Sequence, residues 1–189
     1  MSSPVLPSPR HMLLLALSIL LLATNGGPLS AQDIPVPAGN RRNLTEAPPR
    51  PGMGDVEERA RVLLAAIVAD DPARAMDFFM PREIFAAIKG MSDPDGLHAR
   101  IVRMYENDIH TLHGTVPADA EFVRFEFSGR RSWVVLREET NRLPYWAQRH
   151  NHIVYRSGGQ EHRILVRTMI AWDERWYITH LSDFTRVGP

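Results

Sequence analysis

The sequence predicts an α+β fold in which N-terminal helices pack on an antiparallel sheet of about five strands. Apolar residues recur at helical spacing between residues 55 and 114, and from residue 123 onward they alternate at the two-residue spacing of strands. Two of the alternating segments flank Gly158-Gly159, a residue pair that tight β-hairpin turns favour. Helices that come first and consecutive strands that follow are typical of this class rather than of alternating α/β folds.

Composition excludes several classes of protein and of partner. The 189 residues are 44% apolar and 23% charged, as in one globular domain of ordinary size. Lysine plus arginine and aspartate plus glutamate both number 22, so no net positive field attracts nucleic acid, and we expect no nucleic-acid partner. Arginine supplies all of these basic residues except Lys89. Such a preference for arginine over lysine is common in proteins from GC-rich bacterial genomes. Cysteine is absent, which excludes disulfides, thiolate metal sites and a cysteine nucleophile.

The N-terminus has the pattern of a secretory signal peptide. Arg10 precedes an apolar run at residues 12–23, which is shorter than the roughly 20 residues that a membrane-spanning helix needs. Small residues follow this run, and Leu29-Ser30-Ala31 offers a cleavage site before Gln32. We therefore expect residues 1–31 to be the signal peptide of an exported bacterial protein, periplasmic or secreted, that is not stably inserted in a membrane after cleavage. The alternative is an uncleaved membrane anchor.

Residues 32–54 are predicted to be a disordered linker, and residues 55–186 a single α+β domain. The stretch before Asp55 is rich in proline, glycine, asparagine and arginine, and nothing in it repeats at helical or strand spacing. Its prolines are Pro35, Pro37, Pro48, Pro49 and Pro51.

Capping signals divide residues 55–114 into four helices. Asp55 and Glu58 have the spacing of a capping box, and the apolar positions after them follow a helical period. Two further helices begin where an aspartate precedes a proline, since the carboxylate caps the helix and proline suits its first turn. The predicted starts are Asp55, Asp71, Pro81 and Asp93, and the last two helices are predicted to end near Gly90 and Gly114.

Strand signals follow without interruption. Val123, Phe125 and Phe127 alternate with charged residues, as in a half-buried strand. Both positions of a type I′ turn need positive φ, so Gly158-Gly159 predicts a two-residue hairpin turn. The predicted strands span residues 123–127, 133–136, 145–155, 160–172 and 176–184.

Two segments give the chain a resemblance to a known family. The run AAIVADDPARAM at residues 65–76 and the run WDERWYITHL at residues 172–181 resemble the start and the end of NTF2-like (SnoaL-like) domains. The resemblance implies a cone in which helices close over a curved sheet around a cavity. The chain departs from the family in lacking a clear short strand between the second helix and Gly96. Because the family includes isomerases, dehydratases, cyclases and non-catalytic binding or assembly domains, the resemblance implies a fold and no single function.

Histidines supply the candidate metal ligands. Glu106, His110 and His113 stand at i, i+4 and i+7 of the fourth predicted helix, and two imidazoles with a carboxylate suit zinc or iron. The alternative is a polar helix end, where histidine interacts favourably with the helix dipole. His150 and His152 lie two apart on one face of a predicted strand, and a metal there would need a third ligand from a neighbouring strand. A solvent-facing strand explains this pair better. We expect no metal and no other cofactor.

Turn geometry predicts the register of the last three strands. A two-residue turn at Gly158-Gly159 pairs Arg149 with Thr168. A three-residue loop at residues 173–175 then sets Thr168 beside His180. This register brings the large apolar residues of the three strands together, which is what specifies register in a sheet with one buried face. A β-bulge between Tyr145 and Asn151 would turn Arg149 to the opposite face.

The predicted register leaves a polar island in the middle of an otherwise apolar face. Burying polar groups costs free energy unless they find partners, so the island indicates a bound ligand, water or a helix above it. The candidate ligand-binding residues are Arg149, Asn151, Thr168, His180 and Ser182.

Three functions are compatible with these observations. We favour non-catalytic binding of a small molecule or a protein partner in the cavity that the resemblance implies. The alternative is a cofactor-free enzyme of the isomerase or dehydratase type, with His180 as general acid and base and Arg149 stabilising an anionic oxygen. A third possibility is an assembly domain that forms a homodimer through the exposed face of its sheet.

Overall fold

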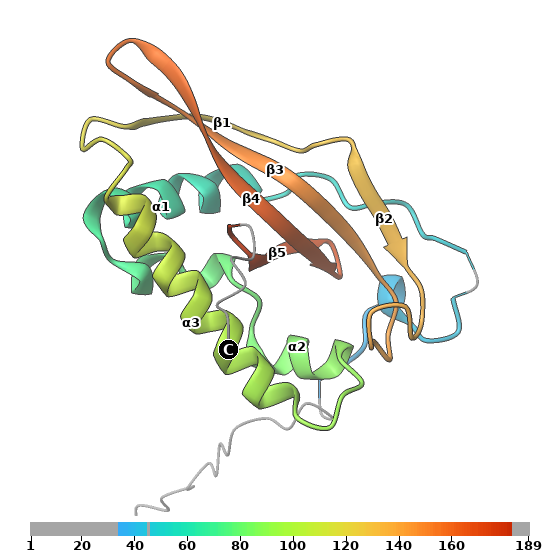
Figure 1. Cartoon of the computed structure of the whole chain (residues 1–189). Coiled ribbons are helices and arrows are strands. Elements are labelled where there is room, and N and C mark those ends of the chain that lie inside the picture. The colour runs from blue at the N-terminus through green and yellow to red at the C-terminus, as the bar shows by residue number, and fades with distance from the viewer. Residues whose placement is uncertain (1–33, 45, 183–189) are drawn as a thin grey trace, which may run out of the picture.

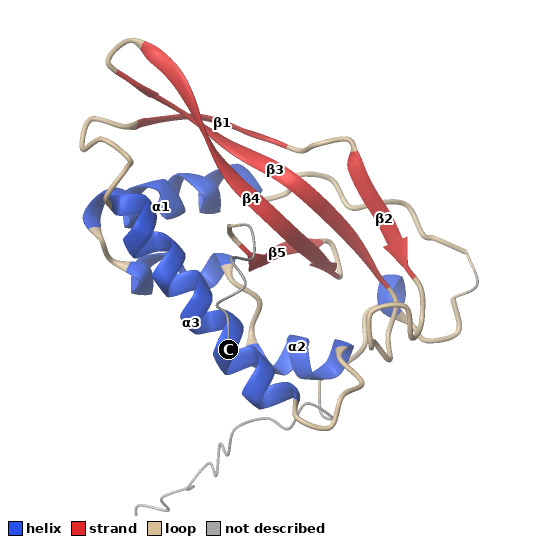
Figure 2. Ribbon diagram, in the orientation of Figure 1, coloured by secondary structure: helices blue, strands red, loops and turns tan. Residues whose placement is uncertain are grey.

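The computed structural model describes residues 34–44 and 46–182. The predicted signal peptide and its cleavage site lie outside these ranges. The predicted α+β class is confirmed: helices come first, and every pairing among the strands after them is antiparallel. Figures 1 and 2 show the helices on one side of a twisted, open sheet. Within the described ranges, no helix has the length and hydropathy needed to cross a bilayer.

The helices form where the sequence places them. They are α1 (Val56–Ala69), the 3₁₀ helix η2 (Pro72–Phe78), α2 (Arg82–Ile88) and α3 (Pro94–His113). Asp93 caps α3 as predicted, because its carboxylate accepts a hydrogen bond from the backbone N–H of Gly96 (2.8 Å). The predicted capping box at Asp55 is wrong. Its carboxylate instead binds the guanidinium groups of Arg59 (2.5 Å) and Arg175 (3.0 Å).

The long hairpin of β3 (Tyr145–Ser157) and β4 (Gln160–Trp172) forms the centre of the sheet. β5 (Arg175–His180) pairs with the far edge of β4. The near edge of β3 is shared by β1 (Glu121–Glu126), which pairs with its second half, and β2 (Arg130–Val134), which pairs with its first half. The core lies between this sheet and the helices, and its fully buried side chains include Leu63, Ile67, Tyr105, Ile109, Ile153 and Trp176.

The register of the first hairpin is confirmed. Gly158 and Gly159 have φ of 55° and 81°, and Arg149 pairs with Thr168. Nine further pairs continue the ladder on either side of this one, from Ala147 to the turn.

The second hairpin turn differs from the prediction, yet the predicted pairing of Thr168 with His180 is present. Its loop has two residues rather than three, so Trp172 pairs with Arg175. Asp173 makes this possible by adopting a φ of 58°, a conformation that aspartate tolerates better than most residues. A β-bulge between Thr168 and Met169 then takes up the one-residue difference. Thr168 therefore still pairs with His180.

Residues 34–44 and 46–54 pack against the sheet, where the composition predicts a disordered linker. The indole N–H of Trp146 donates to the carbonyl of Pro48 (3.0 Å), and that of Trp176 to the carbonyl of Gly52 (2.9 Å). Asn40, at the end of the 3₁₀ helix η1 (Ala38–Asn40), is 3% exposed and accepts from the backbone N–H of Asp173 (3.0 Å). An irregular, proline-rich chain can thus be ordered, because tertiary hydrogen bonds replace the ladder that it lacks. Figure 1 shows the segment passing β2 on its way to α1.

The outer face of the sheet is charged where β1, β3 and β4 meet. Arg124 binds the carboxylates of Glu126 (2.7 Å) and Glu161 (2.9 Å), and Arg163 binds Glu126 (3.2 Å). Arg124 and Arg163 both pair with Val154, on the face opposite Ile153. These residues do not form the flat apolar surface on which a homodimer through the sheet would depend. The homodimer stays a prediction.

Candidate functional site

Three of the predicted ligand-binding residues line one cavity between the sheet and α2. Arg149 of β3, Thr168 of β4 and His180 of β5 are cross-strand neighbours, as the register predicts. The cavity has a volume of about 250 Å³, and we call it the sheet cavity. Phe85 of α2 and Lys89, the residue that ends this helix, form the wall that faces the strands.

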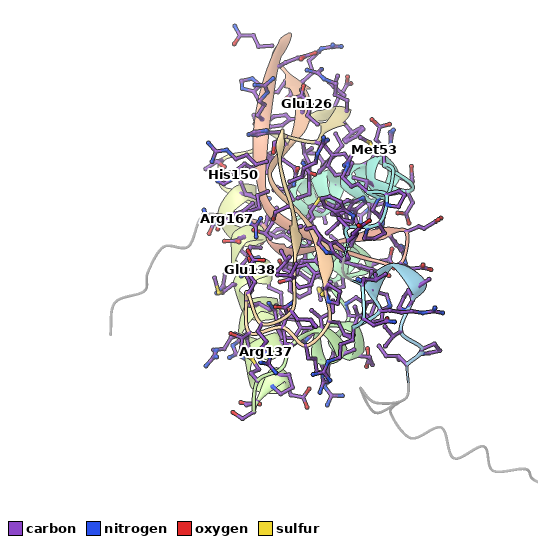
Figure 3. The ribbon with its side chains drawn as sticks, turned by 90° about the vertical axis from the view of Figure 1, so that its right-hand side faces the viewer. Met53, Glu126, Arg137, Glu138, His150 and Arg167 are labelled. Carbon is purple, nitrogen blue, oxygen red and sulfur yellow. The ribbon has the colours of Figure 1, made fainter. Side chains whose placement is uncertain are left out.

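Irregularities in β3 and β4 widen the polar lining of the sheet cavity. In a regular strand, consecutive side chains point to opposite faces. His150 has a φ of 58° in the middle of β3, and both Arg149 and His150 line the cavity. In β4, Arg167 and Thr168 both line it, next to the bulge that follows Thr168. Figure 3 shows His150 and Arg167 close together on one side of the molecule. The irregularity in β3 therefore lies at His150, after Arg149, and the side chain of Arg149 still faces the cavity.

The carboxylate of Glu139 is held among the basic groups of the sheet cavity. One of its oxygens accepts from the guanidinium of Arg149 and the other from the hydroxyl of Tyr145, both at 2.6 Å. The ammonium of Lys89 donates to the Tyr145 hydroxyl (3.3 Å) and to the backbone carbonyl of Glu139 (3.2 Å). Burial works to raise the pKa of Glu139, but the hydrogen bond from Tyr145 and the charges of Arg149 and Lys89 outweigh it and lower that pKa.

Burial and positive charge keep the imidazole of His180 neutral. Burial has the largest effect on its pKa, the charges of Arg167 and Lys89 act in the same direction, and Glu139 opposes them, leaving the pKa at about 4. Burial also lowers the pKa of Lys89, against the attraction of Glu139. Three basic side chains, those of Lys89, Arg149 and Arg167, thus line the cavity. The carboxylate of Glu139 and the imidazoles of His150 and His180 line it as well. This arrangement favours an anionic ligand.

We expect the imidazole of His180 to titrate near pH 4 rather than near 6.5. An unfolded chain binds this proton at a pKa of about 6.5, so between pH 6.5 and 4 the unfolded state binds more protons, and the free energy of unfolding falls as the pH falls. Across this window the wild type should lose on the order of 2 kcal/mol more stability than His180→Gln. Histidine NMR titration and urea unfolding at pH 7 and pH 4 measure the two effects. An imidazole that titrates near 6.5 would contradict the burial argument.

The other two predicted ligand-binding residues have structural contacts and do not line the sheet cavity. Asn151 is 0% exposed, and its amide accepts from the N–H of Ser128 (3.3 Å) and donates to the carbonyls of Gln148 (3.3 Å) and Val166 (3.4 Å). Asn151 thus joins the segment between β1 and β2 to the backbones of β3 and β4. The hydroxyl of Ser182 donates to Asp108 of α3 (2.7 Å). Ser182 thereby ties the chain beyond β5 to that helix.

Sequence reasoning missed three residues that define the sheet cavity. Glu139 lies in the loop between β2 and β3, where a carboxylate is expected to be solvated. Lys89 follows a short helix and is separated from Glu139 by 50 positions along the chain. That it is the chain's single lysine was the one available signal. Arg167 precedes a bulge that no local pattern predicted.

The candidate metal ligands of α3 point to α1 instead of to one another. The imidazole of His110 lies 2.6 Å from a carboxylate oxygen of Asp70, and that of His113 lies 3.1 Å from the backbone carbonyl of Ile67. Both histidines thus fasten the end of α3 to the end of α1. Among residues 34–44 and 46–182, no group of three or more histidine, aspartate or glutamate side chains is arranged to hold a metal ion. Whether the protein carries a metal stays a question for elemental analysis.

A larger hollow of about 610 Å³ opens near the same loop that carries Glu139. Its basic side chains are those of Arg42, Arg137 and Arg142, and we call it the arginine hollow. All three arginines are exposed. The guanidinium of Arg142 donates to the carbonyls of Ala86 and Ala87, so it is partly used in capping α2. The arginine hollow is a second place on the described surface where an anion can bind.

No protein-family model, curated protein or solved structure matches this chain. The resemblance to NTF2-like domains therefore stays a prediction, and the function is argued from the site alone.

Proposed function

We propose that this domain binds a small organic anion in the sheet cavity, without chemistry, after export of the protein. The observation that carries the proposal is the convergence of three basic side chains on one partly open cavity. Lys89 comes from the end of α2, Arg149 from β3 and Arg167 from β4. Charges of one sign repel each other, so an anion beside these groups, the Glu139 carboxylate or that of a ligand, stabilises their convergence.

The size and lining of the sheet cavity limit the ligand. A volume of about 250 Å³ holds about eight water molecules at roughly 30 Å³ each. This is the size of a small organic acid such as benzoate. Phe85 and Ile170 supply apolar wall, while Thr168 and Thr179 supply hydroxyl groups. A ligand with an anionic group and a compact apolar body satisfies both parts of the lining.

The protonation of His180 favours binding over acid–base catalysis. A general acid or base works best when its pKa lies near the working pH. With a pKa of about 4, His180 holds no proton to donate as an acid at neutral pH and is a weak base. The site thus supports ligand binding better than the isomerase or dehydratase alternative.

Replacing Arg149 tests the proposal. Benzoate is the probe, and benzyl alcohol, which has a similar size and no charge, is the comparison ligand. We expect Arg149→Gln to weaken benzoate binding by about ten- to hundredfold, since a charge-assisted hydrogen bond contributes about 1.5–3 kcal/mol. Isothermal titration calorimetry measures the affinity, and thermal unfolding verifies that the variant is folded.

The matched control is Arg103→Gln, on the exposed side of α3. It removes the same charge from the protein at a distance from the cavity and should leave the benzoate affinity unchanged. Equal benzoate affinity in the wild type and Arg149→Gln would refute the proposal, and so would equal affinity for benzyl alcohol and benzoate.

A further inference from the structure

We infer that the carboxylate of Glu139 occupies the anion position of the sheet cavity, and that the ligand is a small carboxylic acid whose carboxylate displaces it. The inference rests on the proposed function and deepens it, because it names the ligand's binding group and the protein atoms that receive it. It assigns Glu139 the role of an internal competitor, one that must leave before the ligand binds.

The contacts of Glu139 are those that a bound carboxylate would make. Its two oxygens are shared between the guanidinium of Arg149 and the hydroxyl of Tyr145, each at 2.6 Å. Charge-assisted hydrogen bonds of this length are strong, and two donors that address the two oxygens of one group suit a carboxylate. Lys89 donates to the same Tyr145 hydroxyl and adds its positive charge.

The side chain of Glu139 can leave this position while its backbone stays in place. Glu139 lies on an exposed loop, and its side chain is 42% exposed. The backbone N–H of Glu139 donates to the amide oxygen of Asn141 (3.1 Å), and Asn141 is only 2% exposed. Thr140, next in the chain, accepts at its carbonyl from the N–H of Gly90 (2.8 Å). Rotation of one side chain toward solvent is therefore sufficient, and no rearrangement of the loop is needed.

Backbone strain on both sides of Glu139 indicates that its placement is specified by the surrounding structure. Arg137 and Thr140 have φ of 67° and 57°, a conformation that residues other than glycine adopt infrequently. Such residues persist only where neighbouring contacts over-determine them, and they concentrate at ligand sites. Figure 3 shows Glu138, between them, on the same side of the molecule as His150 and Arg167.

Exchange of one carboxylate for another keeps a negative charge beside the half-buried basic groups. Lys89 and Arg149 have a carboxylate beside them while Glu139 is in place, and a ligand carboxylate gives them the same partner after it leaves. The rest of the ligand then lies against Phe85 and Ile170, beside the neutral His180. A neutral molecule cannot make this exchange, because it would leave the ammonium and guanidinium groups without an anion.

The test measures benzoate affinity in variants that weaken or remove the competitor. If the Glu139 side chain is away from its position in about one molecule in ten, its removal raises the affinity about tenfold. We expect this gain in Glu139→Ala and a smaller gain in Glu139→Gln, which keeps the hydrogen-bonding shape and loses the charge. Glu138→Gln removes a charge from the same loop at a carboxylate that accepts from the N–H of Val135, and should leave the affinity unchanged. The affinity for benzyl alcohol should not rise in any variant.

The possible outcomes separate this inference from the proposed function. If benzoate binds the wild type through Arg149 and binds both Glu139 variants equally or more weakly, Glu139 is not a competitor and the inference fails while the proposed function stands. If benzoate binds none of the variants, both fail. Binding that is measurable in Glu139→Ala and undetectable in the wild type supports the inference. Should Glu139→Ala unfold, the comparison of Glu139→Gln with Glu138→Gln decides the matter.

Discussion

A chain that begins at Asp55 is expected to unfold at a far lower temperature than the chain that begins at Gln32, or to fail to fold. The deletion removes the carbonyls of Pro48 and Gly52, which accept from the indole N–H groups of Trp146 and Trp176. Because the deletion also exposes both indoles to water, each lost hydrogen bond costs its net contribution of about 0.5–1.5 kcal/mol. Trp176 is 0% exposed in the intact fold, so its lost cover adds a hydrophobic contribution. The sum, on the order of 5 kcal/mol, is comparable to the whole stability of an ordinary domain.

Circular dichroism of the two chains during heating measures this loss, and limited proteolysis gives an independent answer. The protease-resistant core of the longer chain should begin close to residue 34. If trimming reaches Asp55 and the melting temperature is unchanged, the segment of residues 34–54 contributes nothing to stability, and its packing in the structure is wrong.

Asn151→Leu is expected to destabilise the domain by about 2–4 kcal/mol, which for a domain of this size lowers the melting temperature by roughly 10 °C. Leucine fills a similar space and makes none of the amide's hydrogen bonds. The N–H of Ser128 and the carbonyl of Gln148 would lose their partner at the break between β1 and β2. Because Asn151 is fully buried, water cannot replace the amide without opening the sheet.

The same substitution separates a structural role from a binding role. Asn151→Leu should lower stability and, in the fraction that remains folded, keep most of the affinity for benzoate. Arg149→Gln should do the reverse. If Asn151→Leu is as stable as the wild type and loses benzoate binding, Asn151 belongs to the ligand site after all.

The architecture could be predicted because its signals are local. Proline and aspartate mark where α3 begins, and two glycines with positive φ determine the first hairpin. The second turn shows the limit of this reasoning. Its two-residue form depends on the positive φ of Asp173. The bulge after Thr168 compensates for the one-residue shift in pairing, and it depends on how β4 and β5 pair in the sheet. The pairing of Thr168 with His180 was therefore predicted correctly from a turn that was predicted wrongly.

The site could be predicted only in the part that register alone determines. Arg149, Thr168 and His180 follow from strand pairing. Lys89 and Glu139 reach the same cavity through tertiary contacts between a helix end and a loop, which leave no periodic trace in a sequence. Asn151 and Ser182 share the polar character of the other predicted residues. Burial and hydrogen-bond partners, which a sequence does not display, give them structural roles instead.

The most direct test of an anion site in the sheet cavity is a ¹H–¹⁵N spectrum of the arginine Nε–H groups, recorded while benzoate is added. We predict that the signal of Arg149 moves along a saturable curve with the midpoint found by calorimetry. The signals of Arg42 and Arg137 in the arginine hollow should stay in place. Movement of the arginine-hollow signals with no movement at Arg149, or an equal and unsaturable drift of all arginines, would contradict the account.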